Sequence, residues 1–202
     1  PNEVDEDLLA LMAGSKSICP HLHLPLQSGS DLLLERMGRH YSALYFRELV
    51  ARIITVLPDA FIGADVIAGF PGETEAEFEE TVNLLEELPF SDLHVFPYSS
   101  RPGTRAAGMA GQLPSQLIKE RAARLRAVAE RKKREFLRRQ IGHTLEVLVQ
   151  GFDQNTFICN GLSRNYVAVT FVGESALVNR EVPVNVIDCD GEVCSGMISK
   201  NI

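Results

Sequence analysis

The sequence predicts an α/β domain at residues 1–140 and a small all-β barrel at residues 141–202. Apolar runs with strand and helix periodicity alternate through the first part, which indicates parallel strands joined by right-handed helical crossovers. A long, charged helical segment follows at 115–140. After Gly142 the pattern changes to five short strands separated by turns, which is typical of a small barrel of the OB type.

Three strands and their helices are expected in the first domain. The stretch HLHLPLQ alternates, so its leucines lie on one face and its two histidines, Pro25 and Gln27 lie on the other. Three strands are too few to close a barrel. The expected elements are strands at 19–27, 61–70 and 92–99 and helices at 31–38, 41–58, 74–88 and 115–140.

The polar face of the first strand has two interpretations. A strand that runs directly into a helix usually lies in a sheet covered on both sides, so a polar face indicates a cavity or a site. The alternative is a strand end at the surface, where Gln-Ser-Gly-Ser makes a turn. Ser30 or Asp31 is the expected N-cap of the helix that follows.

The second strand, FIGADVIAGF, carries Asp65 in an otherwise apolar run. A buried carboxylate is unfavourable unless it has a partner, so Asp65 is a candidate ligand for sugar hydroxyls or cations. Thr74 and Glu77 fit a capping box at the start of the next helix.

In the third strand His94, Phe96 and Tyr98 share one face. They are either core residues or substrate contacts. The loop that follows carries Arg101 and Arg105, at the end of a parallel strand where ligands bind in α/β folds.

The second domain is expected to contain five strands, at 143–151, 156–163, 165–172, 181–189 and 192–200.

Charge is distributed unevenly in this chain of 202 residues with a net charge of −7. Residues 1–118 hold 7 basic and 17 acidic side chains, whereas residues 119–140 hold 10 basic and 3 acidic. The basic helix could bind phosphates. The alternative is a solvated linker helix that turns a few apolar residues to the domains, namely Leu125, Val128, Phe136 and Leu137.

The four cysteines have no spacing typical of a zinc site, and we expect mostly reduced thiols in a cytoplasmic protein. Cys189 and Cys194 could meet across a hairpin, which the sequence does not decide. No run is long and apolar enough for a membrane span, and no signal peptide is visible. The start at Pro1 suggests a fragment or a processed chain.

Three motifs together resemble one family. The series HxPxQSGSD, DVIxGFPGET and FPYSxRPGT is similar, in order and spacing, to the radical-SAM tRNA methylthiotransferases, the MiaB-like family. The likeness continues to the C-terminus, where the β domain resembles a TRAM domain, an RNA-binding module. LHVFPYSSRPGT and NYVAVTF look closest to the branch that acts on N6-threonylcarbamoyladenosine; the isopentenyladenosine and ribosomal-protein branches are the alternatives.

The resemblance implies a fold, a cofactor and a reaction. The first domain would be the C-terminal half of a radical-SAM partial (β/α)6 barrel. The complete enzyme would use S-adenosylmethionine and [4Fe–4S] clusters to add a methylthio group at C2 of a modified adenosine beside the tRNA anticodon. Gln27 would contact the methionine part of S-adenosylmethionine, Arg39 its carboxylate, and Asp65 its ribose.

The resemblance also implies what this chain does not carry. The family's CxxxCxxC motif and its N-terminal cluster domain are not in this sequence. We therefore expect half of an enzyme, inactive alone, whose partners are tRNA and the N-terminal half. Self-association through the open barrel edge is also expected. The expected RNA contacts are Arg131, Lys132, Lys133, Arg134, Asn165 and Tyr166.

A different class of function is an RNA-binding module without catalysis, formed by the basic helix and the small barrel. The acidic balance of the second domain weakens that interpretation. A separate enzyme class finds no support, since no P-loop, nucleophile elbow or zinc motif is visible.

Overall fold

The computed structural model describes residues 1–199 and divides into two compact units. The first unit contains Pro1–Ser15 and Leu22–Lys132, and the second contains Lys16–His21 and the residues from Lys133 onward. Helix α5 (Ser115–Arg139) begins in the first unit and ends in the second. None of the helices within residues 1–199 has the length and apolar character that crossing a membrane requires.

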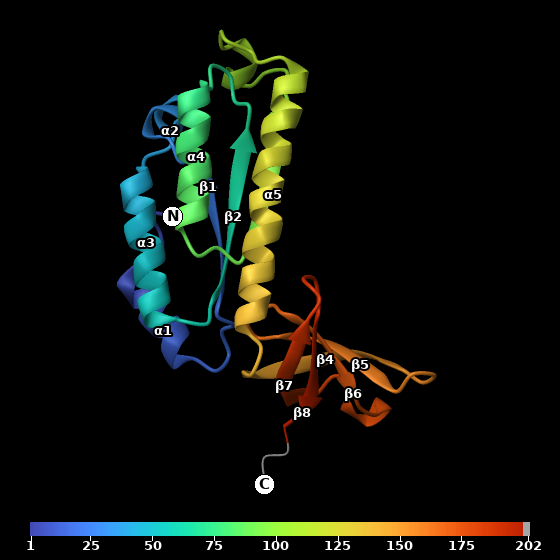
Figure 1. Cartoon of the computed structure of the whole chain (residues 1–202). Coiled ribbons are helices and arrows are strands. Elements are labelled where there is room, and N and C mark those ends of the chain that lie inside the picture. Colours follow the sequence, from blue (N-terminus) through green and yellow to red (C-terminus); the bar gives the residue numbers. More distant parts are fainter. Residues whose placement is uncertain (200–202) are drawn as a thin grey trace. The chain divides into compact units, whose positions relative to one another are not determined.

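The first unit is built on a three-stranded sheet in the order β1-β2-β3, in which β2 and β3 pair in parallel. Strands and helices alternate along the chain, as predicted (Figure 1). The elements before α5 are α1 (Glu6–Gly14), β1 (His21–Gln27), α2 (Asp31–Arg36), α3 (Ala43–Val56), β2 (Phe61–Ala68), α4 (Glu75–Glu87), β3 (Asp92–Pro97) and the 3₁₀ turn η1 (Arg105–Gly108).

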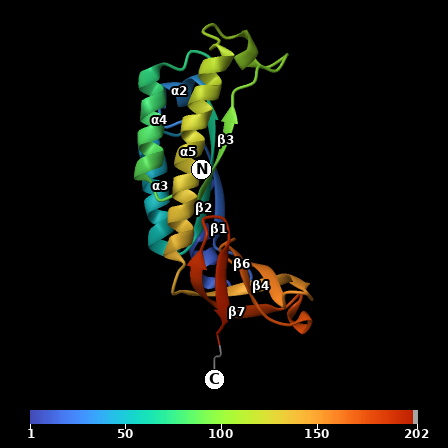
Figure 2. The same ribbon diagram turned by 45° about the vertical axis from the view of Figure 1, so that its right-hand side comes forward.

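One face of this sheet forms the core of the first unit. Figure 2 shows α3, α4 and α5 together on one side of the strands. The leucines of β1 are buried, as their alternation predicted, and so are Ile62 and Val66 of β2. Large apolar side chains of the helices, such as Phe46, Ile53 and Phe78, are completely buried. Burial of such a side chain contributes roughly 1.5–3 kcal/mol, which explains why the helices cover this face.

Side-chain caps fix where the helices of the first unit begin. Thr74 and Glu77 form the predicted capping box of α4. Ser42 caps α3 by accepting a hydrogen bond from the backbone N–H of Tyr45. Helix α1 was not predicted, although Asp5 gives it an N-cap signal by accepting from the backbone N–H of Leu8.

A buried ion pair joins α5 to the loop before α4. Arg121 donates through Nη1 to the backbone oxygen and to Oε2 of Glu73, both at 2.8 Å. The same Oε2 accepts from the backbone N–H of Gly69 at 2.8 Å. Both side chains are at least 95% buried, at 5% and 1% relative exposure. Burial raises the pKa of the Glu73 carboxyl, against the opposing effect of these hydrogen bonds.

The second unit contains a closed five-stranded barrel, which confirms the predicted small barrel. Its strands follow the order β4-β5-β6-β8-β7, and the antiparallel pairing of β4 with β7 closes it. Small β-branched residues such as Val147, Val169 and Val184 fill its interior. The elements are β4 (Thr144–Asp153), β5 (Ile158–Ser163), β6 (Ala168–Val172), the 3₁₀ turn η2 (Ser175–Leu177), β7 (Glu181–Cys189) and β8 (Cys194–Ile198).

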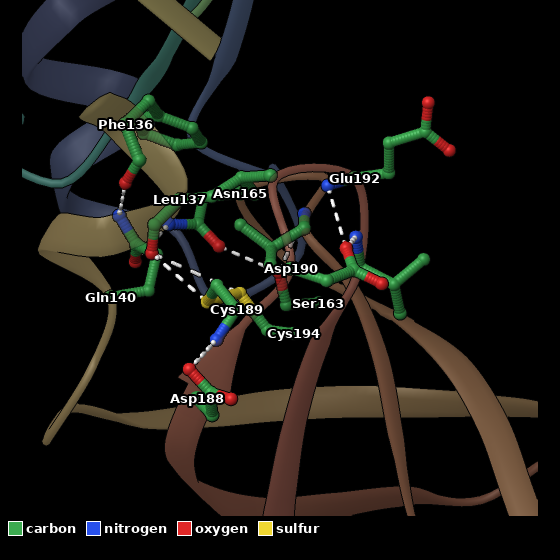
Figure 3. Close-up of a disulfide and its surroundings, with 12 residues drawn as sticks. Phe136, Leu137, Gln140, Ser163, Asn165, Asp188, Cys189, Asp190, Glu192 and Cys194 are labelled. Atoms are coloured by element: carbon green, nitrogen blue, oxygen red, sulfur yellow. Dashed lines mark hydrogen bonds between the residues drawn. A yellow bond between two sulfur atoms is a disulfide. The ribbon is translucent and has the colours of Figure 1, made fainter. Parts of the chain in front are cut away.

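A disulfide joins Cys189 and Cys194, which face each other across the β7–β8 hairpin (Figure 3). Their sulfur atoms lie 3.2 and 3.8 Å from the carbonyl oxygen of Leu137 in α5. Cys19 and Cys159 are free. The expectation of mostly reduced thiols is therefore corrected for one pair, because the antiparallel register places these two residues directly opposite each other.

The expected (β/α)6 half barrel is not confirmed beyond three strands with their helices. β1 and β3 are the edge strands of the sheet formed by the described residues. Because the outer edges of these two strands are unpaired among the described residues, self-association through them remains a prediction.

Candidate functional site

Three polar side chains meet on the face of the sheet opposite the helices, which we call the open face. His23 comes from β1, Asp65 from β2 and His94 from β3, and Asp65 and His94 are register partners in the parallel pair. The Nε2 atom of His23 lies 2.7 Å from Oδ1 of Asp65, and Nδ1 of His94 lies 3.6 Å from the same oxygen. The two imidazole rings are 4.5 Å apart and tilted. Asp65 therefore has the partner that its position in an apolar strand requires.

Gly63 provides the space in which the His23 ring lies. A Cβ atom at position 63 would approach Nδ1 of His23 to 2.6 Å, well inside van der Waals contact. The backbone of Gly63 has no positive φ, so the glycine is needed here for the close approach of the imidazole. Strand alternation alone places Gly63 and Asp65 on one face, but it does not identify the ring that lies against the glycine.

Gln27 ends β1 in a conformation that side chains rarely adopt. Its φ is 69°, in the left-handed region, although it is not glycine. The residue is only 7% exposed, and its amide makes no hydrogen bond to residues 1–199. A strained backbone at the end of a strand makes Gln27 a candidate ligand contact.

Contacts with α4 fix the conformation of the turn after Gln27. The Thr81 hydroxyl accepts from the backbone N–H of Gly29 at 2.9 Å and is 3.0 Å from the hydroxyl of Ser28. A Cβ at Gly29 would lie 2.7 Å from Cα of Thr81, so only glycine lets α4 approach this closely. The small polar residues of the QSGS turn thus hold the strand end rigidly in place.

The three predicted cofactor residues do not form one cluster. Gln27 lies four residues beyond His23 on β1, which is about 13 Å at the usual strand rise, whereas Asp65 contacts His23 directly. Arg39 follows α2 and is exposed. Its side chain makes no hydrogen bond or ion pair within the described part of the chain. A ligand that touched all three would have to be extended.

A pocket of about 320 Å³ lies at the carboxyl ends of β2 and β3. Its lining includes Ile67, Phe70, Phe96, Tyr98 and Arg101. The Tyr98 hydroxyl is buried and has no hydrogen-bond partner among residues 1–199. This is the edge where parallel sheets bind ligands. Phe96, Tyr98 and Arg101 were predicted from the sequence, whereas Phe70 was not, although it lies in the GFPG turn after β2.

The described residues of the first unit offer groups that suit S-adenosylmethionine. An unpartnered amide at Gln27, a half-buried carboxylate at Asp65 and an apolar pocket with a buried hydroxyl suit S-adenosylmethionine, which has an amino acid part, a ribose and a flat base. An iron–sulfur cluster needs several thiolates together. Two of the four cysteines here form the disulfide, and burial raises the pKa of the Cys159 thiol.

The predicted RNA contacts on α5 differ in accessibility. Lys132 is 7% exposed and donates to the backbone oxygen of Glu86, and Arg131 forms an ion pair with the Glu86 carboxylate. Lys133 is half-buried and Arg134 is exposed. The structure therefore disfavours Lys132 as a phosphate contact, because its ammonium is already used within the first unit. The apolar residues assigned to the linker interpretation are all buried: Leu125, Val128, Phe136 and Leu137.

The two predicted contacts in the small barrel also differ. Asn165 is 4% exposed, donates to Oε1 of Gln140 and accepts from Ser163. Its amide stabilises the turn between β5 and β6, so a direct RNA contact is disfavoured. Tyr166 has a φ of 60°, is 47% exposed and stacks on His21 with ring centroids 3.9 Å apart. Its exposed ring remains a candidate for stacking on a base.

Parallel strands joined by helical crossovers define the first unit as an α/β domain. Residues 1–85 of this domain match the sequence model of the Radical SAM superfamily. All three residues predicted to bind S-adenosylmethionine lie within this match.

The most similar relatives include three proteins named tRNA-2-methylthio-N(6)-dimethylallyladenosine synthase. The protein from Desulfitobacterium hafniense (strain Y51) is 37% identical over 191 residues, which covers 94% of this chain and 43% of the relative. The protein from Thermobifida fusca (strain YX) is 45% identical over 149 residues, or 74% of this chain and 30% of the relative. The protein from Acetivibrio thermocellus is 37% identical over 187 residues, or 92% of this chain and 39% of the relative.

These relatives correct one prediction and support another. Their name specifies a dimethylallyl group, which favours the isopentenyladenosine alternative and does not support the threonylcarbamoyladenosine branch. They agree with the expected likeness to tRNA methylthiotransferases. The chain spans less than half the length of the curated relatives that it matches.

Proposed function

We propose that this chain forms the C-terminal part of a tRNA methylthiotransferase. The complete protein would add a methylthio group at C2 of N6-dimethylallyladenosine beside the anticodon. The observation that carries this proposal is the likeness to the Desulfitobacterium hafniense protein, which extends over 94% of the chain and so includes both units.

The first unit would bind S-adenosylmethionine, which supplies the methyl group and the radical chemistry when bound. The amide of Gln27 can donate to and accept from the methionine part. The Arg39 guanidinium can pair with the cofactor carboxylate, and Asp65 can accept from ribose hydroxyls. The pocket at the ends of β2 and β3 would exclude water around the flat base.

The second unit would act as a TRAM-like RNA-binding barrel. The closed five-stranded barrel and the exposed Tyr166 ring support this proposal. Arg134, close to the β7–β8 turn at Gly191, could add a phosphate contact beside the barrel.

The proposed function can be tested by expressing the complete protein in a bacterial strain that lacks its own methylthiotransferase. Nucleosides from the tRNA of this strain would be measured by mass spectrometry, with an empty vector as the control. We expect 2-methylthio-N6-dimethylallyladenosine to appear. A methylthio group on threonylcarbamoyladenosine instead would assign the other branch, and the absence of any new methylthio nucleoside would overturn the proposal.

The contribution of the basic helix can be tested with the double variant Lys133→Gln/Arg134→Gln. If both side chains contact phosphates, binding of an anticodon stem-loop should weaken about 3–10-fold, and the slope of log affinity against log salt should decrease by about 1–2. The measurement is a filter-binding titration at two salt concentrations.

The matched control for this test is Lys119→Gln/Arg126→Gln, which removes the same charge from exposed positions on the same helix. Equal affinity and equal salt slope for both double variants would show that α5 is a solvated linker.

A further inference from the structure

We propose that His23, Asp65 and His94 form a binding site for a divalent transition-metal ion of the Zn²⁺ or Fe²⁺ type. The three side chains project from three neighbouring strands onto the open face, and their ligand atoms lie within 4.8 Å of one another. Two imidazoles with one carboxylate are a donor set that binds zinc and non-haem iron in many proteins.

The distance between Asp65 and His94 is close to that of an occupied site, and the distance between Asp65 and His23 is shorter. Metal–nitrogen and metal–oxygen bonds of about 2.0–2.1 Å in tetrahedral geometry separate two ligand atoms by about 3.3 Å. Nδ1 of His94 and Oδ1 of Asp65 are 3.6 Å apart, which is too long for a good hydrogen bond and close to this separation. Nε2 of His23 is 2.7 Å from Oδ1, so its ring needs to move outward by about 0.6 Å.

The surroundings of the cluster permit this adjustment. The side chains of His23 and Asp65 are each 29% exposed and that of His94 is 59% exposed, so no packed core holds the rings in place. Gly63 leaves the space in which the His23 ring lies. Exposure also leaves coordination positions open for water or a substrate group, which is the arrangement of catalytic rather than structural metal sites.

This metal site is not part of the proposed function, in which none of the three residues binds a metal ion. Asp65 would bind the metal through Oδ1, and its second oxygen would remain for a ribose hydroxyl. The two proposals fail separately, since metal binding is measured on this chain of 202 residues with the metal alone, without tRNA or S-adenosylmethionine.

The test is a Co²⁺ titration of the chelator-treated chain, followed by visible absorption, with Zn²⁺ competition measured by calorimetry. The background carries Cys19→Ser, which removes the exposed free thiol as a competing ligand. We expect one Co²⁺ per chain with the absorption of a four- or five-coordinate site, displaced by one equivalent of Zn²⁺.

The variants His94→Ala and Asp65→Asn should each weaken metal binding at least 100-fold. His143→Ala, which removes an exposed histidine in the second unit, should leave it unchanged. Gly63→Ala should also weaken binding, because the new Cβ displaces the His23 ring.

Circular dichroism would verify that each variant is folded, and His94 is exposed enough for its alanine variant to fold normally. Failure of the chain to bind one equivalent of Co²⁺ or Zn²⁺, or equal affinity in His94→Ala and His143→Ala, would overturn the proposal. The cluster would then be a hydrogen-bonded His–Asp pair with a neighbouring histidine.

Discussion

Replacing Arg121 with methionine is expected to lower the free energy of unfolding of the first unit by about 3–5 kcal/mol. The guanidinium forms hydrogen bonds with both the backbone oxygen and the carboxylate of Glu73, and both side chains are buried. Methionine keeps much of the apolar volume but leaves the Glu73 charge without its cation. The measurement is urea unfolding followed by circular dichroism at 222 nm, which reports mainly on the helices of the first unit.

Arg124→Met is the matched control for this prediction. Arg124 lies on the same helix, stacks over the same Phe78 ring and forms ion pairs with Glu75 and Glu79, but it is 49% exposed. Exposed ion pairs contribute about 0–1 kcal/mol, so this variant should lose no more than that. Equal losses in the two variants would contradict the assignment of the effect to the buried charge.

The loss of stability caused by Arg121→Met should depend on pH in a defined direction. Burial already raises the pKa of Glu73 in the folded protein, and losing Arg121 removes hydrogen bonds that lower it. The folded variant therefore binds a proton more readily than the unfolded chain, so its stability decreases as the pH rises through the folded pKa. The difference in free energy of unfolding between the variant and wild type should be largest near neutral pH. It should become smaller as the pH falls toward the pKa range of an ordinary carboxyl group. A difference that grows on acidification would contradict this explanation.

Local patterns were enough to predict the strands and most helices, because alternation and capping depend on neighbouring residues. The leucines of β1 are buried and the Thr74–Glu77 capping box is present, as expected. Helix α1 was missed because it is short and its large apolar residues do not keep to one face: Leu9 and Met12 are buried, whereas Leu8 and Leu11 are exposed. The five short strands indicated a barrel, but only the structure gives the order in which β8 lies between β6 and β7.

The candidate site could be predicted only in part, because its geometry depends on contacts between distant segments. Asp65 was recognised as a costly polar residue in a strand, but its pairing with His23 and His94 requires the register of three strands. The same limit applies to the basic helix. Charge alone selected Lys132, whereas its burial against Glu86 depends on how α5 packs on α4. Conversely, nothing in the sequence revealed the positive φ of Gln27.

Replacing Gln27 with glycine should separate the role of its side chain from that of its backbone. A left-handed conformation costs a non-glycine residue roughly 1–2 kcal/mol, and glycine removes this strain. Loss of the side-chain packing and the greater freedom of glycine in the unfolded chain oppose that gain. The free energy of unfolding of Gln27→Gly should therefore lie within about 1 kcal/mol of the wild-type value. Gln27→Ala keeps the strained backbone and should be less stable than Gln27→Gly by about 1 kcal/mol.

Both substitutions should strongly impair the complete enzyme under the proposed function. The Gln27 amide makes no hydrogen bond to residues 1–199, so its polar atoms remain available for the cofactor. Two hydrogen bonds to charged groups contribute about 3 kcal/mol or more together, and their loss should weaken S-adenosylmethionine binding about 100-fold. Equilibrium dialysis of the complete protein with labelled S-adenosylmethionine measures this directly. If Gln27→Gly bound the cofactor as tightly as wild type and Gln27→Ala did not, the left-handed backbone rather than the amide would be the feature that the site requires.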